Sequence, residues 1–209
     1  MINEPGTPGA GFSAGVESRP AMGEVFEAPR WMFAFECYDK DGNLKWAETI
    51  HNTVCTEGKK DILDQYFGTG AAGTAPSAIY LGLISADSYS SHAVGDTAAQ
   101  INGSNGWKEA NSSTFNPTYT GSRKSLQATL TAASGTTTVT KTTSATQDYV
   151  MTGPGTVKGA FIIAGGSATT GNTTGKLYSA GLFSESGGAD RAVLATDTLK
   201  VTPSLTMAA

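Results

Sequence analysis

The side chains that most often perform acid–base or metal chemistry are few in this chain and far apart. Its two histidines, His51 and His92, stand about forty residues apart, and no set of four ligands with the spacing of a zinc site surrounds either one. We therefore predict no metal site. We interpret His51 as a polar residue on the face of a strand and His92 as a loop residue.

The segment Asp39-Lys40-Asp41-Gly42-Asn43 carries the side-chain oxygens of a calcium loop. An EF-hand loop needs glycine at its sixth position and glutamate at its twelfth, whereas here the glycine is fourth and the twelfth position is Ile50. Asp-Gly is the favoured central pair of a tight hairpin turn. We therefore interpret 39–43 as the turn of a β-hairpin.

Glycine-rich runs and scattered carboxylates do not define a catalytic site in this sequence. Residues 153–156 and 165–167 lack the Gly-Lys-Ser/Thr ending of a phosphate-binding loop. Asp87, Asp96 and Glu109 have the chemistry of a glycosidase pair, but nothing in the sequence singles out two of them. We predict no catalytic residue, no cofactor and no enzymatic activity, with a glycan hydrolase as the third-ranked function.

The composition is poor in charge and rich in glycine. Charged residues make up 15% of the chain, against about 25% in an average soluble protein, and 26 of the 209 residues are glycine. Such a composition favours short strands, tight turns and long loops over a helical bundle. The net charge is −4 and the pI about 5.1, so we predict no direct binding of nucleic acid. No apolar run approaches the ~18 residues of a membrane span.

Residues 1–30 differ from the rest of the chain. Four of the eight prolines and five glycines fall here, and no apolar period of 2 or 3.6 is present, so the segment cannot bury a face of its own. We predict an extended N-terminal arm that a partner surface or another copy of the chain orders; the alternative is packing against its own domain. The expected apolar anchors of the arm are Phe12, Val16, Met22, Val25 and Phe26.

Residues 31–209 are predicted to form a mainly β domain. An aromatic-rich strand over 31–38 and a second strand over 44–54 form a hairpin around the Asp-Gly turn. The segment 86–125 has no clear period. Further strands are expected at 79–85, 125–131, 136–142, 157–164, 176–183, 191–195 and 198–205. Short strands separated by glycine-rich turns are typical of an antiparallel β-sandwich or jelly roll.

One short helix is expected in this domain. Thr56 is placed to cap a helix over residues 57–67, and Gly68 is placed to end it. Apolar residues at helical spacing then share one face, namely Ile62, Leu63, Tyr66 and Phe67. The predicted fold class is an antiparallel β-sandwich or jelly-roll-like domain with one short helix and an extended N-terminal arm.

Four further residues have expected roles inside or between subunits. Cys37 and Cys55 lie on segments that we interpret as neighbouring strands, and no secretory signal is visible. We therefore expect two buried, reduced thiols rather than a disulfide. Trp107 is a candidate anchor of the long loop that lies within the irregular segment 86–125. Arg123 follows that loop and is a candidate bridge from the loop to the domain or between two subunits, with a local surface pair as the alternative.

Eight segments spread over roughly residues 44–205 carry a family pattern. They are HNTVCTEGKKDILDQYF (51–67), IYLGLI (79–84), DT (96–97), GWKE (106–109), the stretch from Tyr119 to Arg123, VKGAFII (157–163), GKLYS (175–179) and DTLKVT (197–202). These segments resemble those of tailed-bacteriophage virion proteins that are commonly labelled tail-fibre or decoration proteins. The resemblance implies a β-sandwich core with central strands at 157–163 and 198–202, and with Gly106 and Trp107 anchoring the long loop.

The resemblance and the arm together lead to a functional expectation. We expect a capsid decoration (cement) protein, made in the host cytoplasm, that binds the major capsid protein on the outer surface of a phage head as a homotrimer. The alternative is a tail, fibre or adaptor component that binds a receptor or a tail partner. A fibre requires a repeat or a coiled-coil shaft, and the sequence shows neither.

Overall fold

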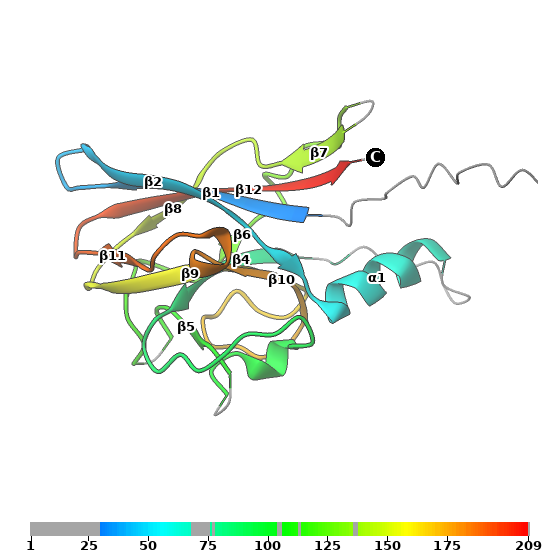
Figure 1. Cartoon of the computed structure of the whole chain (residues 1–209), viewed down its shortest axis with the longest axis horizontal. Helices are drawn as coiled ribbons and strands as arrows, with labels where there is room; N and C mark the ends of the chain where they lie inside the picture. The colour runs from blue at the N-terminus through cyan, green and yellow to red at the C-terminus, as the bar shows by residue number, and fades with distance from the viewer. Residues whose placement is uncertain are drawn as a thin grey trace, which may run out of the picture.

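Two antiparallel β-sheets packed face to face form the domain (Figure 1). The computed structural model describes residues 30–67, 76, 78–103, 106–112, 114–135 and 138–208. Sheet A contains, in order, β2 (Leu44–His51), β1 (Arg30–Tyr38), β12 (Thr198–Ala208) and β7 (Thr138–Thr142), with β8 (Gln147–Val150) also paired to β12. The mainly β, sandwich-like fold class predicted from the sequence is confirmed, whereas a jelly-roll topology stays a prediction.

Sheet B lies beneath sheet A and has shorter edge strands. Its order is β3 (Thr53–Val54), β10 (Lys176–Leu182), β9 (Gly155–Ala164), β4 (Ile79–Ser85) and β5 (Lys108–Glu109), with β11 (Arg191–Val193) paired to β9 and β6 (Lys124–Ser125) paired to β4. Helix α1 (Thr56–Phe67) packs beside β10. Two 3₁₀ turns, η1 (Ala98–Gln100) and η2 (Ser184–Ser186), complete the described elements.

The β1–β2 hairpin forms where the sequence predicts it, but the second strand, expected over 44–54, ends at His51, and Thr53–Val54 is the separate strand β3 of sheet B. Phe33 pairs with Ile50 and Cys37 with Trp46 across the two strands. In the turn, Asp39 Oδ1 accepts hydrogen bonds from the backbone N–H groups of Asp41 and Asn43, both at 2.9 Å. The turn oxygens therefore cap the turn's own backbone, which is the structural role predicted for this segment.

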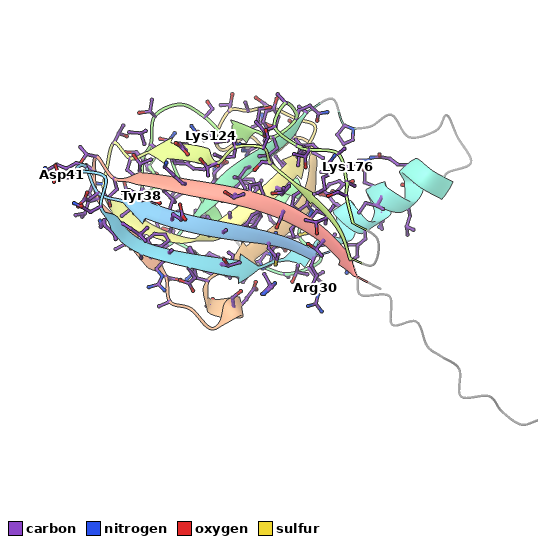
Figure 2. All side chains as sticks on the ribbon, turned by 90° about the horizontal axis from the view of Figure 1, so that it is seen from above. Arg30, Tyr38, Asp41, Lys124 and Lys176 are labelled. Atoms are coloured by element: carbon purple, nitrogen blue, oxygen red, sulfur yellow. The ribbon has the colours of Figure 1, made fainter. Side chains whose placement is uncertain are left out.

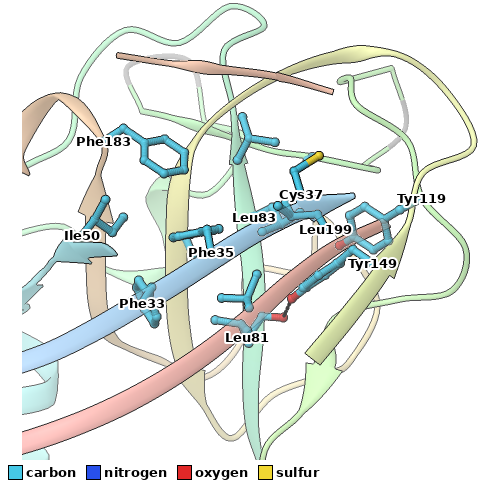
Figure 3. Close-up of a cluster of buried hydrophobic side chains, with 14 of the residues drawn as sticks. Phe33, Phe35, Cys37, Ile50, Leu81, Leu83, Tyr119, Tyr149, Phe183 and Leu199 are labelled. Atoms are coloured by element: carbon cyan, nitrogen blue, oxygen red, sulfur yellow. Dashed lines mark hydrogen bonds between the residues drawn. The ribbon is translucent and has the colours of Figure 1, made fainter. Parts of the chain in front are cut away.

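Every second side chain of β1 belongs to the core between the two sheets. Residues 31, 33, 35 and 37 point inward and are buried, while their neighbours face outward. Phe35 meets Phe183 with ring centroids 4.8 Å apart. Tyr149 enters from β8, and its hydroxyl donates to Leu81 O at 2.9 Å (Figure 3). The inner faces of both sheets thus form one apolar layer.

Sheet B is buried on both faces, which explains its continuous apolar strands. Its inner face contacts sheet A, and a second apolar cluster lies on its outer face, where Phe161 and Ile163 contact Trp107 and Ile101. The loop between β4 and β5, which contains Ala98, Ile101 and Trp107, supplies most of this second layer. A strand covered on both sides has no polar face, so β4 and β9 show runs of apolar residues rather than alternation.

Some predicted elements differ from the structure. The strand expected at 125–131 is limited to β6, because Thr129 N–H donates to Leu126 O in a tight turn. Strand β8 was not predicted. Thr56 is the first helical residue rather than a cap, and its hydroxyl donates to Val94 O at 3.2 Å. On α1, Leu63 is 57% exposed, so it is not part of a buried face.

Candidate functional site

A groove of about 420 Å³ opens at the end of the sandwich where β1 begins. We call it the end groove. Its apolar lining comes from both sheets and the helix: Trp31 and Leu205 from sheet A, Ile79, Ile162 and Tyr178 from sheet B, and Ile62 from α1. Clefts of about 300–1,000 Å³ with mostly apolar walls are the usual form of a binding site. The end groove is therefore the strongest candidate binding site among the described residues.

Polar side chains stand among these apolar walls. Gln65, Gln127 and Lys141 also line the groove. Lys141 Nζ donates to Thr131 O at 2.7 Å, and no carboxylate within the described ranges forms an ion pair with it. The groove thus presents one cationic side chain that has no counter-charge in the described part of the chain.

Helix α1, one wall of the groove, is fixed to β10 by a buried carboxylate. Asp61 accepts hydrogen bonds from Gln65 Nε2 at 2.7 Å, from Tyr178 Oη at 3.0 Å and from Lys176 Nζ. Burial acts to raise the pKa of Asp61, but these hydrogen bonds outweigh it and hold the pKa below its ordinary value. The helix also lies close to the strand, because a Cβ on Gly58 would meet Tyr178 O at 2.5 Å.

Arg123, a residue predicted as an anchor, forms a buried ion pair with Glu109. Nε and Nη2 of Arg123 donate to the two carboxylate oxygens at 2.8 and 2.7 Å, and neither side chain is exposed. Arg123 also donates to Ser167 O and Asn172 O, at 3.2 and 2.7 Å. Its guanidinium lies 5.3 Å from the centroid of the Phe161 ring. The structure therefore places Arg123 inside the domain, as a bridge between two loops and sheet B, and a surface pair does not fit its burial.

The Glu109 carboxylate completes this arrangement. Burial raises the pKa of Glu109, while the hydrogen bonds from Arg123 and from Gly171 N–H act in the opposite direction. Because every donor around it comes from a loop, the carboxylate holds the loop before β6 and the loop after β9 in one position. We call Arg123 and Glu109 the loop clamp.

Trp107, the other predicted anchor, lies within the second apolar cluster. Its side chain is fully buried and meets the Phe161 ring at a centroid distance of 4.9 Å. Within the described ranges its Nε1–H has no hydrogen-bond partner. The contact with β9 places Trp107 where it holds the long loop against the outer face of sheet B.

The histidines and cysteines lie apart from the end groove. His51 is exposed on β2, and the His92 side chain is 3% exposed with Nδ1 3.3 Å from Glu185 Oε1. Cys37 and Cys55 are free and buried, as predicted. Burial, with the nearby Asp197 carboxylate, raises the pKa of Cys37 to about 11. Burial, and after it the charge of Asp96, raises that of Cys55 to about 12.

Cysteine, histidine and carboxylate side chains do not gather into a metal site where the chain is described. The structure shows no group of three or more of them placed to hold an ion within those ranges. One Gly-x-Ser-x-Gly spacing occurs in the sequence, from Gly11 to Gly15. It serves as a nucleophile elbow only between a strand and a helix. It falls, with the predicted arm anchors Phe12, Val16, Met22, Val25 and Phe26, outside the described residues.

The described helix is too short to cross a bilayer. A comparison of the chain with protein-family models, with curated proteins and with solved structures finds no match.

Proposed function

We propose that this chain is a capsid decoration protein that binds the outer surface of a phage head and stabilises the junctions between capsomers. Three observations support the proposal. The first is the resemblance to phage virion proteins in eight segments of the sequence. The second is the way the predicted arm joins the domain, and the third is the outer face of sheet A.

The observation that carries the proposal is the position of β1. This strand continues directly from residues 1–29 and is an inner strand of sheet A. It pairs with β12 at nine positions, from Arg30 with Thr206 to Tyr38 with Thr198, and with β2 on its other side. Tension along an arm held by a partner therefore enters a strand whose hydrogen bonds on both sides resist it together. An edge strand would be held on one side alone.

The outer face of sheet A is suited to contact with a larger protein. Along β1 and β12 it carries mostly small or hydroxyl-bearing residues, among them Ala34, Thr202 and Ser204, and its charged residues are Arg30, Glu36 and Lys200. No described helix covers this face (Figure 2). Few charges have to be desolvated when such a face is covered, which lowers the cost of binding.

The total stabilisation of a shell would be the sum of many identical contacts. Burial contributes roughly 25 cal/mol per Å² of apolar area, but the ordering of an extended arm offsets much of this gain. An arm of thirty residues reaches at most about 100 Å when fully extended, at ~3.3 Å per residue. This length is enough to cross from one capsomer to its neighbour. A modest gain at each site becomes large over a whole shell.

Removal of the arm tests the proposal. We expect a chain that lacks residues 1–28 to bind bare phage heads more weakly than the full chain and to protect them less against heating. Sedimentation of the heads with bound protein measures the first effect, and release of packaged DNA on heating measures the second. Equal binding and equal protection by the truncated and full chains would show that the arm does not fasten the protein to the head.

The number of copies per particle separates the two placements considered. Hundreds of copies on each particle, counted by quantitative mass spectrometry of purified virions, support a position on the head. A handful of copies instead indicates a tail or adaptor component.

A further inference from the structure

We propose that the end groove is a binding site for the root of the arm, residues 22–26 of the same chain, with the Val25 and Phe26 side chains against its apolar walls. This inference concerns the isolated protein and holds whatever partner the distal part of the arm binds. It assigns an occupant to the groove and divides the arm into an anchored root and a free distal part.

The position of the groove identifies its occupant. The described chain begins at Arg30, and the next residue, Trp31, is itself part of the groove wall. Phe26 lies four residues before Arg30, so its Cα can lie at most about 13 Å from that of Arg30. A segment tethered this closely has an effective concentration in the millimolar range. The chain's own root is therefore favoured over the same segment of a second copy.

The chemistry of the groove matches this segment. The lining is mostly apolar, with Ile79, Ile162 and Leu205 on opposite sides. Val25 and Phe26 are adjacent apolar residues, so an extended chain turns one of them toward each wall. Burial of an aromatic side chain stabilises such a contact more than burial of any other side chain in this segment.

The charges match as well. Glu24 and Glu27 flank the two apolar residues. Lys141 is the charged side chain that the groove's described lining contains, and its ammonium group has no carboxylate partner among the described residues. With Val25 and Phe26 in the groove, either glutamate is within reach of Lys141. The same root with lysines in place of the glutamates would be repelled.

The anchored root explains how the arm can transmit a load. Phe12 lies thirteen residues and Val16 nine residues before Val25, and both stay outside the groove. They remain available to a partner. A root seated beside Trp31 joins the free part of the arm to the core through side-chain packing as well as through the backbone of β1.

Disulfide trapping tests the occupant of the groove. Phe26→Cys is combined with Gln65→Cys on α1 in one variant and with Gln127→Cys, a lining residue just after β6, in another. A disulfide requires the two Cα atoms to come within about 7 Å. The two native thiols are buried and have raised pKa values, so they compete little. We expect mild oxidation of at least one variant to give an intramolecular link, identified by mass spectrometry of the monomer.

Control variants carry Phe12→Cys in place of Phe26→Cys. We expect the link to form in about one-tenth of the yield or less with this distal position. Equal yields with Phe12 and Phe26 would overturn the proposal. Covalent dimers in place of linked monomers would overturn it too, because they would show that a second copy supplies the root.

A stability measurement does not depend on the added cysteines. In the full chain without heads, we expect Phe26→Asp to lower the Tm by about 4–8 °C, as loss of a buried aromatic contact does in a domain of this size. Phe12→Asp should leave the Tm unchanged. A Phe26→Asp chain with the Tm of the natural protein would refute the proposal. Head binding is measured separately, so weak binding by Phe12→Asp with a normal groove would bear on the proposed function alone.

Discussion

Replacement of Arg123 by methionine tests whether the loop clamp holds the two loops onto sheet B. Methionine keeps most of the aliphatic volume, removes the charge and leaves Glu109 buried without a cation. The carboxylate loses the hydrogen bonds from Nε and Nη2, at 2.8 and 2.7 Å. The carbonyl groups of Ser167 and Asn172 lose their donor in the same step.

The expected loss is large for a single substitution. Removal of one partner from a buried ion pair costs about 3–5 kcal/mol of unfolding free energy. In a domain of this size, 1 kcal/mol corresponds to about 2–4 °C, so we expect the Tm to fall by about 6–20 °C. Calorimetry and urea unfolding at pH 7 measure it. The control is Lys40→Met, which removes an ion pair whose side chains are 68% and 61% exposed and should change the Tm by about 1 °C or less.

The same variant should show a distinctive pH dependence. Without the guanidinium, burial raises the pKa of Glu109 further, against an unfolded value of about 4.3. A carboxyl group whose pKa is raised by folding stabilises the folded state below its unfolded pKa and loses that contribution as the pH rises through its folded pKa. The deficit of Arg123→Met should therefore shrink as the pH falls from 8 toward 4. A deficit under about 1 kcal/mol at pH 7, or one that is constant over this range, would refute the reasoning.

Three further predictions concern the core and the thiols. Tyr149→Phe removes the bond to Leu81 O at 2.9 Å and should cost about 1–3 kcal/mol in urea unfolding, whereas Tyr38→Phe, at an exposed bond to Glu36, should have little effect. Gly159→Ala should abolish soluble expression, because the added Cβ would overlap the backbone oxygen of Gly181; the control Gly95→Ala meets nothing within 4 Å and should express normally. With pKa values of about 11 and 12, Cys37 and Cys55 should resist a thiol reagent at pH 8 until the chain unfolds, and rapid labelling of either in the folded protein would contradict their burial.

Much of the fold was predictable because burial leaves a pattern in the sequence. Along β1, the aromatic residues Trp31, Phe33 and Phe35 stand at alternate positions, which indicates one buried face. In β4 and β9 the apolar residues are continuous, and the structure gives the reason, since loops cover the outer face of sheet B. The Asp41-Gly42 pair fixed the hairpin turn, where Gly42 has φ of +82°.

Elements set by long-range contacts were harder to predict. Strand β8 has four residues and is defined by its pairing with β12, in which Tyr149 meets Leu199. A run this short carries too little periodicity to be recognised. Leu126 and Leu130 suggested a strand at 125–131, but Leu130 N–H also bonds back to Leu126 O in the turn. Local hydrogen bonds overrode the β propensity of the threonines there.

The candidate site was predicted least well. The end groove draws its walls from segments as far apart in the sequence as Trp31 and Leu205, so no local motif marks it. Glu109 and Arg123 were each singled out by residue type, as a carboxylate and as a rare arginine, but their pairing depends on how the loop folds. An acid and an arginine fourteen residues apart within a long, irregular segment are a signal to consider a buried pair.

The pairing of β1 with β12 has a consequence for the synthesis of this protein. The ribosome makes Tyr38 about 160 residues before its partner Thr198. At about 5–20 residues per second, the β1–β2 hairpin waits roughly 8–32 s for the strand that completes its sheet. During that time Phe33 and Phe35 have no finished core and one edge of β1 is open, which invites aggregation. Holdase chaperones therefore have a defined target in the growing chain.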